Sequence, residues 1–151
     1  MKYVKQYKFP IVFLISILLS VTGCTVKYVA DYDASIKEEI FQVANKVDFF
    51  WGTLLDTQVT DRKYDKFKDQ YNQIESDIRG LVMKNEVRAL NKESTKQANI
   101  ALKLWMEDKS IHKGNDNFSD FEAKRHRKQF NRVFTAMAKG EDAKNITMTK
   151  D

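Results

Sequence analysis

The feature that most constrains this chain is its lack of helix breakers. The only proline of the 151 residues is Pro10, and after Gly23 only four glycines occur in the remaining 128 residues. Proline disfavours a helix interior by about 3 kcal/mol and glycine by about 1 kcal/mol relative to alanine. Long, uninterrupted helices are therefore expected. No stretch sustains the alternation of apolar and polar residues that is typical of a β-strand.

Four segments carry apolar residues at spacings of three and four, which places them on one face of a helix. These segments are 35–57, 61–84, 94–113 and 119–144. Three of them have a single stripe that we expect to be buried. The stripes are Ile36, Ile40, Val43, Val47, Phe50, Trp51 and Leu54; Tyr64, Phe67, Tyr71, Ile74, Ile78, Leu81 and Val82; and Ala123, His126, Phe130, Val133, Phe134 and Met137.

The third segment is apolar on two sides. One stripe is Ala98, Ala101, Leu102 and Trp105, and the other is Ile100, Leu104 and Ile111. A helix with two apolar sides is either more deeply buried than its neighbours or binds a partner. The pattern alone leaves both alternatives open.

Three capping boxes are expected to begin the first, third and fourth helices. In each, a serine is followed three residues later by a glutamate or glutamine that can bond back to the serine amide. The pairs are Ser35 with Glu38, Ser94 with Gln97, and Ser119 with Glu122.

These elements predict an all-α protein, a compact antiparallel bundle of about four helices over residues 34–144. The aromatic residues of the stripes are expected to form its core rather than a cofactor site, and no cofactor is expected. Residues 145–151 are predicted to be a disordered tail.

The first 23 residues have the pattern of a secretory signal peptide. Lys2, Lys5 and Lys8 precede an apolar run of about a dozen residues, which is short for a membrane-spanning helix of about 20. The single cysteine, Cys24, follows directly. An exported chain with one cysteine can form no intramolecular disulfide.

The sequence Val21-Thr22-Gly23-Cys24 resembles the bacterial lipobox, in which an aliphatic residue and two small residues precede the cysteine that is lipidated. The resemblance implies cleavage before Cys24, a diacylglyceryl group on its thiol and an amide-linked acyl chain such as palmitate. Residues 24–33 would then be the lipidated N-terminus and a short tether. More than one acyl chain gives stable membrane attachment.

The residue after the lipidated cysteine sorts bacterial lipoproteins between membranes. Here it is Thr25 rather than aspartate, so the resemblance favours the outer membrane, with the protein facing the periplasm. In a bacterium with one membrane, the same anchor would hold the protein on the outer face of the cell membrane.

The net charge of +5 depends partly on the signal peptide. Without its three lysines, 23 basic residues face 21 acidic ones. The chain therefore gives no support to a nucleic-acid-binding function.

The densest charge is the run 124–128, in which Lys124, Arg125 and Lys128, together with Arg132, are expected to lie opposite the apolar stripe of the fourth helix. This face is either simply solvated or attracts an envelope protein or another anionic envelope component. Phe121 is expected on the same face, and Phe41 and Phe49 lie off the stripe of the first helix. Several exposed aromatic residues together would mark a binding patch.

Candidate catalytic chemistry is sparse. Glu122 and His126, one helical turn apart, could share a metal with His112, although His126 lies on an apolar stripe and a core histidine is the simpler interpretation. The adjacent carboxylates Glu107 and Asp108 are expected to be solvated. No nucleophile elbow or phosphate-binding loop is present.

The lipobox, together with residues 47–50, 101–105 and 126–130, resembles small all-helical bacterial lipoproteins of uncharacterised activity. The resemblance implies no catalytic residue. We therefore expect a membrane-anchored envelope lipoprotein acting as a non-enzymatic helical binding or adaptor module. The alternative is a small metal-binding protein or enzyme centred on His126, Glu122 and His112.

Overall fold

A computed structural model describes residues 28–148, and this part of the chain is a bundle of four α-helices without a β-strand. The all-α prediction is confirmed. The elements are α2 (Ala34–Asp56), the short 3-10 helix η1 (Val59–Asp61), α3 (Tyr64–Glu86), α4 (Lys92–Asn115) and α5 (Asp120–Met148).

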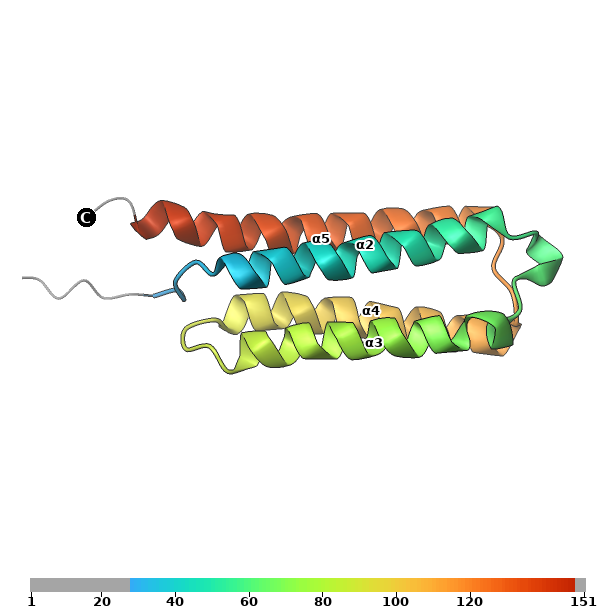
Figure 1. Ribbon diagram of the computed structural model, residues 1–151, viewed down its shortest axis with the longest axis horizontal. Coiled ribbons are helices and arrows are strands. Elements are labelled where there is room, and N and C mark those ends of the chain that lie inside the picture. Colours follow the sequence, from blue (N-terminus) through green and yellow to red (C-terminus); the bar gives the residue numbers. More distant parts are fainter. Residues whose placement is uncertain (1–27, 149–151) are drawn as a thin grey trace, which may run out of the picture.

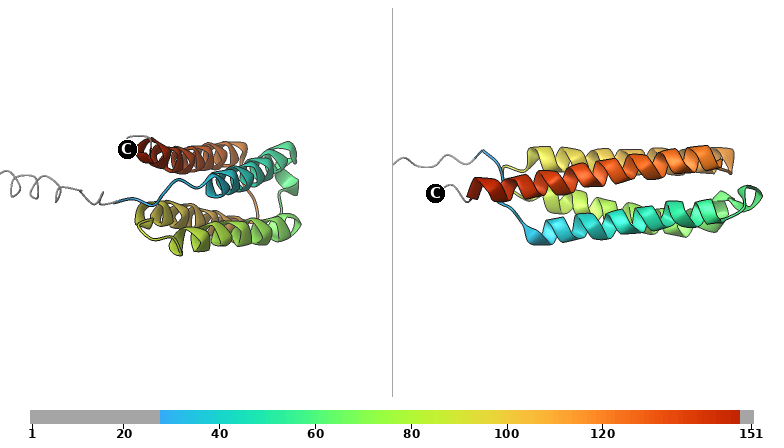
Figure 2. Two further views of the ribbon diagram at one scale, coloured as in Figure 1. Left: turned by 60° about the vertical axis from the view of Figure 1, so that its left-hand side comes forward. Right: turned by 90° about the horizontal axis from the view of Figure 1, so that it is seen from above.

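The helices run alternately up and down, as predicted. α2 packs against α5 and α3, and α4 packs against α3 and α5, so each helix contacts two neighbours. In Figure 1 the pair α2 and α5 lies above the pair α3 and α4. One end of the bundle holds residues 28–33, the α3–α4 turn and the end of α5, and the other end holds η1 and the α4–α5 connection (Figures 1 and 2).

The predicted stripes of α2, α3 and α5 form the core. All seven stripe residues of α2 are buried, and in α3 and α5 only Tyr64 and Val133 are partly exposed. At the centre the Phe50 ring meets the rings of Trp51, Tyr71 and Trp105 edge on, with centroids 5.2, 4.5 and 5.1 Å away. Such edge-to-face pairs add to the stability that burial gives.

The second apolar stripe of α4 is not deeply buried. Ile100 and Ile111 are exposed, and Leu104 is only partly covered. Of the two alternatives, deeper burial is therefore wrong for this stripe.

Two of the three predicted capping boxes are wrong. Asp33 caps α2, because its Oδ1 accepts from the Ser35 amide at 2.8 Å and also from the Ser35 hydroxyl. α4 begins at Lys92, two residues before Ser94. The third box is confirmed, since Glu122 Oε2 accepts from the Ser119 amide at 2.9 Å and Ser119 Oγ accepts from the Glu122 amide at 3.3 Å.

The helix ends also differ from the prediction. α4 continues past Gly114 to Asn115, where Asp116 adopts a left-handed conformation and its amide donates to the His112 carbonyl. α5 continues to Met148, so residues 145–148 of the predicted tail are helical. Residues 149–151 lie outside the described part of the chain.

Arg62 fastens the end of the bundle that holds η1. Its side chain is 2% exposed and donates to the carbonyls of Thr57, Leu55 and Phe118 at 2.9, 3.1 and 3.0 Å. It also donates to Asp120 Oδ1 at 2.6 Å. One guanidinium thus joins the end of α2 to the start of α5.

None of the helices in the described range 28–148 combines the length and the apolar character that crossing a membrane requires.

Replacing Arg62 with methionine should lower the free energy of unfolding by about 3 kcal/mol, because the buried Phe118 carbonyl and the partly buried carbonyls of Thr57 and Leu55 lose their donor. Urea denaturation measures this change. The matched control is Arg79→Met, which removes an exposed ion pair with Glu75 and should cost less than about 0.5 kcal/mol. Equal stabilities of the two variants would contradict the role given to Arg62.

Candidate functional site

The outer face of α5 carries the largest set of unneutralised charges that we find in residues 28–148. The capping box at Ser119 fixes where the helix starts, and the spacings of three, four and seven then align five basic residues along one side. We call this set the α5 cationic stripe. It consists of Lys124, Arg125, Lys128, Arg132 and Lys139.

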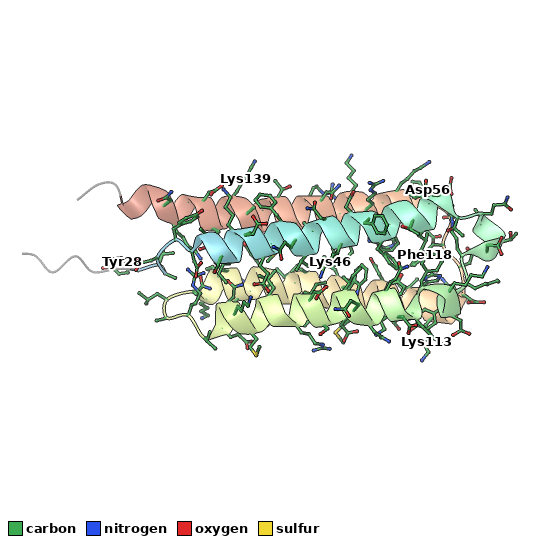
Figure 3. All side chains as sticks on the ribbon, in the orientation of Figure 1. Tyr28, Lys46, Asp56, Lys113, Phe118 and Lys139 are labelled. Atoms are coloured by element: carbon green, nitrogen blue, oxygen red, sulfur yellow. The ribbon has the colours of Figure 1, made fainter. Side chains whose placement is uncertain are left out.

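The structure confirms that the four predicted members of the stripe lie on the exposed side of α5 and adds Lys139, which projects away from the bundle (Figure 3). The core residues His126, Phe130 and Met137 lie on the opposite side. Residues 123–140 contain no aspartate or glutamate, so no acid interrupts the stripe along the helix.

Within residues 28–148, the basic residues of the α5 cationic stripe form almost no ion pairs with carboxylates. Within residues 28–148, Arg125, Lys128, Arg132 and Lys139 have no carboxylate within 4.0 Å, and Lys124 lies 3.9 Å from Asp120. Arg127 shows the contrast, because it points toward α2 and donates to Asp48 through Nε at 2.7 Å and Nη2 at 2.6 Å. This guanidinium lowers the pKa of Asp48 below its ordinary value.

The C-terminal half of the stripe borders a shallow hollow on α5. Its lining residues are Lys128, Asn131, Arg132, Thr135, Ala136 and Lys139. Small and polar side chains between three cations leave the charged groups accessible. A flat or extended anionic surface could therefore reach them together.

The exposed aromatic residues do not form one patch. Phe121 lies at the start of the stripe and is 74% exposed, and Phe49 and Phe41 are exposed on α2. No ring contact joins these three side chains. The Lys37 ammonium lies over the Phe41 ring, with Nζ 6.0 Å from the ring centroid. Only Phe121 therefore belongs to the α5 surface.

His126 is a core residue paired with Asp108. Its Nδ1 lies 2.9 Å from Asp108 Oδ2, and its ring stacks on Trp51 with centroids 5.2 Å apart. Although Nδ1 and Oδ2 are close, neither makes a hydrogen bond within residues 28–148, and Arg125 Nη2 lies 3.4 Å from the other ring nitrogen, Nε2. The expectation that Asp108 is solvated is wrong: it is 5% exposed, and burial raises its pKa.

His112 is also in the core, with both ring nitrogens engaged. Nε2 lies 2.8 Å from the Arg62 carbonyl and must donate to it, so Nδ1 accepts from the Tyr71 hydroxyl at 3.2 Å. Burial lowers the pKa of His112, which favours this neutral tautomer.

The candidate metal ligands Glu122, His126 and His112 are not assembled into a ligand set. Glu122 bonds to Ser119 at the start of α5, while each histidine has the core partners described above. In the described part of the chain, no group of three or more His, Cys, Asp or Glu side chains could hold a metal ion.

A buried charge network at the other end of the bundle was not predicted. Glu141 accepts from Lys144 and Arg88, and Lys144 also donates to Asn91 Oδ1 at 2.7 Å. Glu141 and Lys144 continue the buried side of α5 beyond Met137 and Ala138. The predicted helix includes both residues, but its predicted stripe ends at Met137; continuing the stripe by four and seven residues reaches Glu141 and Lys144.

The lipobox residues Val21, Thr22 and Gly23, together with Cys24 and Thr25, lie outside the described residues. Their roles remain sequence-based predictions.

His112 makes stability depend on pH. Its folded pKa is below the unfolded value of 6.5, so the unfolded state binds more protons below pH 6.5 and stability falls as the pH falls through this range. We expect His112→Gln, which can retain the donor to the Arg62 carbonyl, to lose less stability between pH 7.5 and 5 than the parent protein. Urea midpoints at both pH values measure this. The same loss in both proteins would contradict the assignment.

We compared the chain with models of known protein families, with curated proteins and with solved structures. No family model, no curated protein and no solved structure matches it.

Proposed function

We propose that this protein is a membrane-anchored lipoprotein of the bacterial envelope that acts as a non-enzymatic binding module. In this proposal Cys24 carries the lipid anchor, and the α5 cationic stripe binds an anionic envelope protein or another anionic envelope component. Thr25 favours an outer-membrane location facing the periplasm.

The observation that carries the proposal is the absence of carboxylates along residues 123–140, combined with the fact that four of the five stripe residues have no ion pair within residues 28–148. At 1.5 Å per residue, the stripe from Lys124 to Lys139 extends over roughly 23 Å. A linear array of this kind favours an extended or broad anionic partner over a small ligand.

Several basic residues on the other helices form ion pairs between helices. Lys46, Lys84 and Lys109 each bond to a carboxylate of α2 or α3, namely that of Asp77, Glu39 or Glu75. These charges stabilise packing between helices. The stripe residues stabilise no such contact, so their placement supports a role in attracting a partner.

The attraction would be electrostatic and would weaken with salt. Near an anionic surface, each basic residue contributes about 1 kcal/mol, and the field decays within a Debye length of about 8 Å at physiological ionic strength. Arg132 and the nearby lysines can therefore supply a useful affinity only when several act together.

Lys128→Glu combined with Arg132→Glu should abolish partner recovery, because it places two carboxylates in the middle of the stripe. The lipidated protein is crosslinked in its native membrane and captured, and its partners are quantified by mass spectrometry. The expected loss is about ten-fold or more, since 1.4 kcal/mol corresponds to a factor of ten.

The matched control is Lys96→Glu combined with Lys113→Glu. Both lysines are exposed on α4 and unpaired among the described residues, so the double substitution changes the net charge equally. A partner that is recovered with this control but lost with the stripe variant supports the proposal. A partner recovered equally with both variants, or lost equally with both, contradicts it.

A further inference from the structure

The segment before α2 is fastened to one end of the bundle. The Ala30 amide donates to the Leu90 carbonyl at 3.1 Å, Arg88 donates to the Asp31 carbonyl, and the Asp33 amide donates to Glu141 Oε1 at 3.0 Å. Ala30 itself is buried. These bonds come from the α3–α4 turn and from α5, so the position of residues 30–33 is fixed relative to the helices.

This attachment limits how far the bundle can lie from a lipid on Cys24. From Cys24 to Ala30 there are six residues, which span at most about 20 Å when fully extended. α2 alone, with 23 residues, is about 35 Å long. An anchor at Cys24 would therefore hold the Ala30 end close to the membrane and could leave the end with η1 well away from it.

Exposed apolar side chains gather at that same end, and we call them the apolar tip. Tyr28 and Val87 are about four-fifths exposed, and the others are about half exposed or slightly more. They come from the segment before α2, the last turn of α3 and the α3–α4 turn. The members are Tyr28, Val29, Met83, Val87 and Leu90.

Leu90 is the most informative member of the tip. Its φ of 59° lies in the left-handed region, where glycine or asparagine is usual and other residues are strained. Its side chain is 55% exposed, so core packing does not explain the leucine. The bundle itself therefore gives no packing reason for a leucine at this position.

The charges of the turn do not favour an anionic surface. Glu86 and Lys92 flank it with opposite signs, and Arg88 is turned inward to Glu141. The exposed charges beside the turn, including Lys84 and Glu93, are mixed in sign, so the tip has no net charge that would attract an anionic surface. Tyrosine and aliphatic side chains of this kind suit the interface between lipid headgroups and acyl chains.

We propose that the apolar tip contacts the bilayer that holds the acyl chains of Cys24, so that the bundle stands with this end on the membrane. This inference rests on the lipid anchor of the proposed function. It places the end of the bundle that contains Asp56 and Lys113 away from the lipid (Figure 3). The α5 cationic stripe then runs away from the membrane and is open to a partner beside the protein.

The test uses the full lipidated protein in phosphatidylcholine vesicles containing lipids with nitroxide-labelled acyl chains. Acylation of Cys24 leaves no free thiol, so one introduced cysteine can be labelled with a fluorophore. Val87→Cys places the label on the tip, and Lys113→Cys places it at the opposite end. We expect at least three-fold stronger quenching at residue 87 than at residue 113, with no requirement for anionic lipid.

A second comparison tests the side chains themselves. With the label at Glu86→Cys, the pair Val87→Ser and Leu90→Gly should at least halve the quenching. The glycine relieves the positive φ, so folding is not expected to suffer. The control is Phe121→Ser, which removes an apolar side chain about as exposed as Val87 but near the opposite end of the bundle. It should leave the quenching unchanged.

Mass spectrometry of the N-terminal peptide separates the two ways of failing. If Cys24 is acylated but residues 87 and 113 are quenched equally, the tip does not contact the bilayer and this inference is wrong, while the anchor stands. If Cys24 is not acylated, the proposed anchor is wrong and the inference fails with it.

Discussion

Phe50, Trp51, Tyr71 and Trp105 meet edge to face at the middle of the bundle, and the arrangement of the four helices depends on this contact. The rings come from α2, α3 and α4. The Trp105 indole donates to the Tyr71 carbonyl at 3.0 Å, which satisfies its polar group inside the core. Phe130 of α5 packs on Trp105 with centroids 5.6 Å apart, so the fourth helix joins the same centre. The α5 cationic stripe faces outward because this contact holds the other side of α5 inward.

Polar contacts fix the two ends of the bundle. Arg62 joins α2 to α5 at one end, and Glu141 joins α5, the α3–α4 turn and the segment before α2 at the other. A buried charge that loses its partner is strongly destabilising, so such contacts oppose sliding of one helix along another. The same network at Glu141 brings the chain that leads to Cys24 to the apolar tip. In the proposed arrangement, the lipid anchor and the orientation of the bundle are therefore linked through one buried carboxylate.

Much of the fold could be predicted because the stripes are local patterns. The seven core residues of α2 follow from their spacing alone, and Ser119 and Glu122 form their box because both partners lie within one turn. The buried polar contacts could not be predicted in this way. The register of α4 indicated the burial of Asp108, which lies three residues after Trp105 on the buried side, whereas the exposed Glu107 lies off it. Its partner His126 could not be predicted, because the two meet only after α4 and α5 pack together.

The candidate site likewise has features that the sequence predicts and features that depend on how the helices pack. The charge and the outward direction of Lys124, Arg125, Lys128 and Arg132 could be predicted from the helical register. That Arg125, Lys128 and Arg132 form no ion pair within residues 28–148 could not be predicted, because it depends on which acids of other helices lie nearby, as the pairing of Arg127 with Asp48 shows. Leu90 was also missed, since its conformation is set by the turn between two packed helices.

The account as a whole depends on the anchor, and the intact mass of the protein extracted from its native membrane tests it most directly. The account predicts the mass of residues 24–151 increased by a diacylglyceryl group and one further acyl chain. A mass equal to that of residues 1–151 without modification would contradict it.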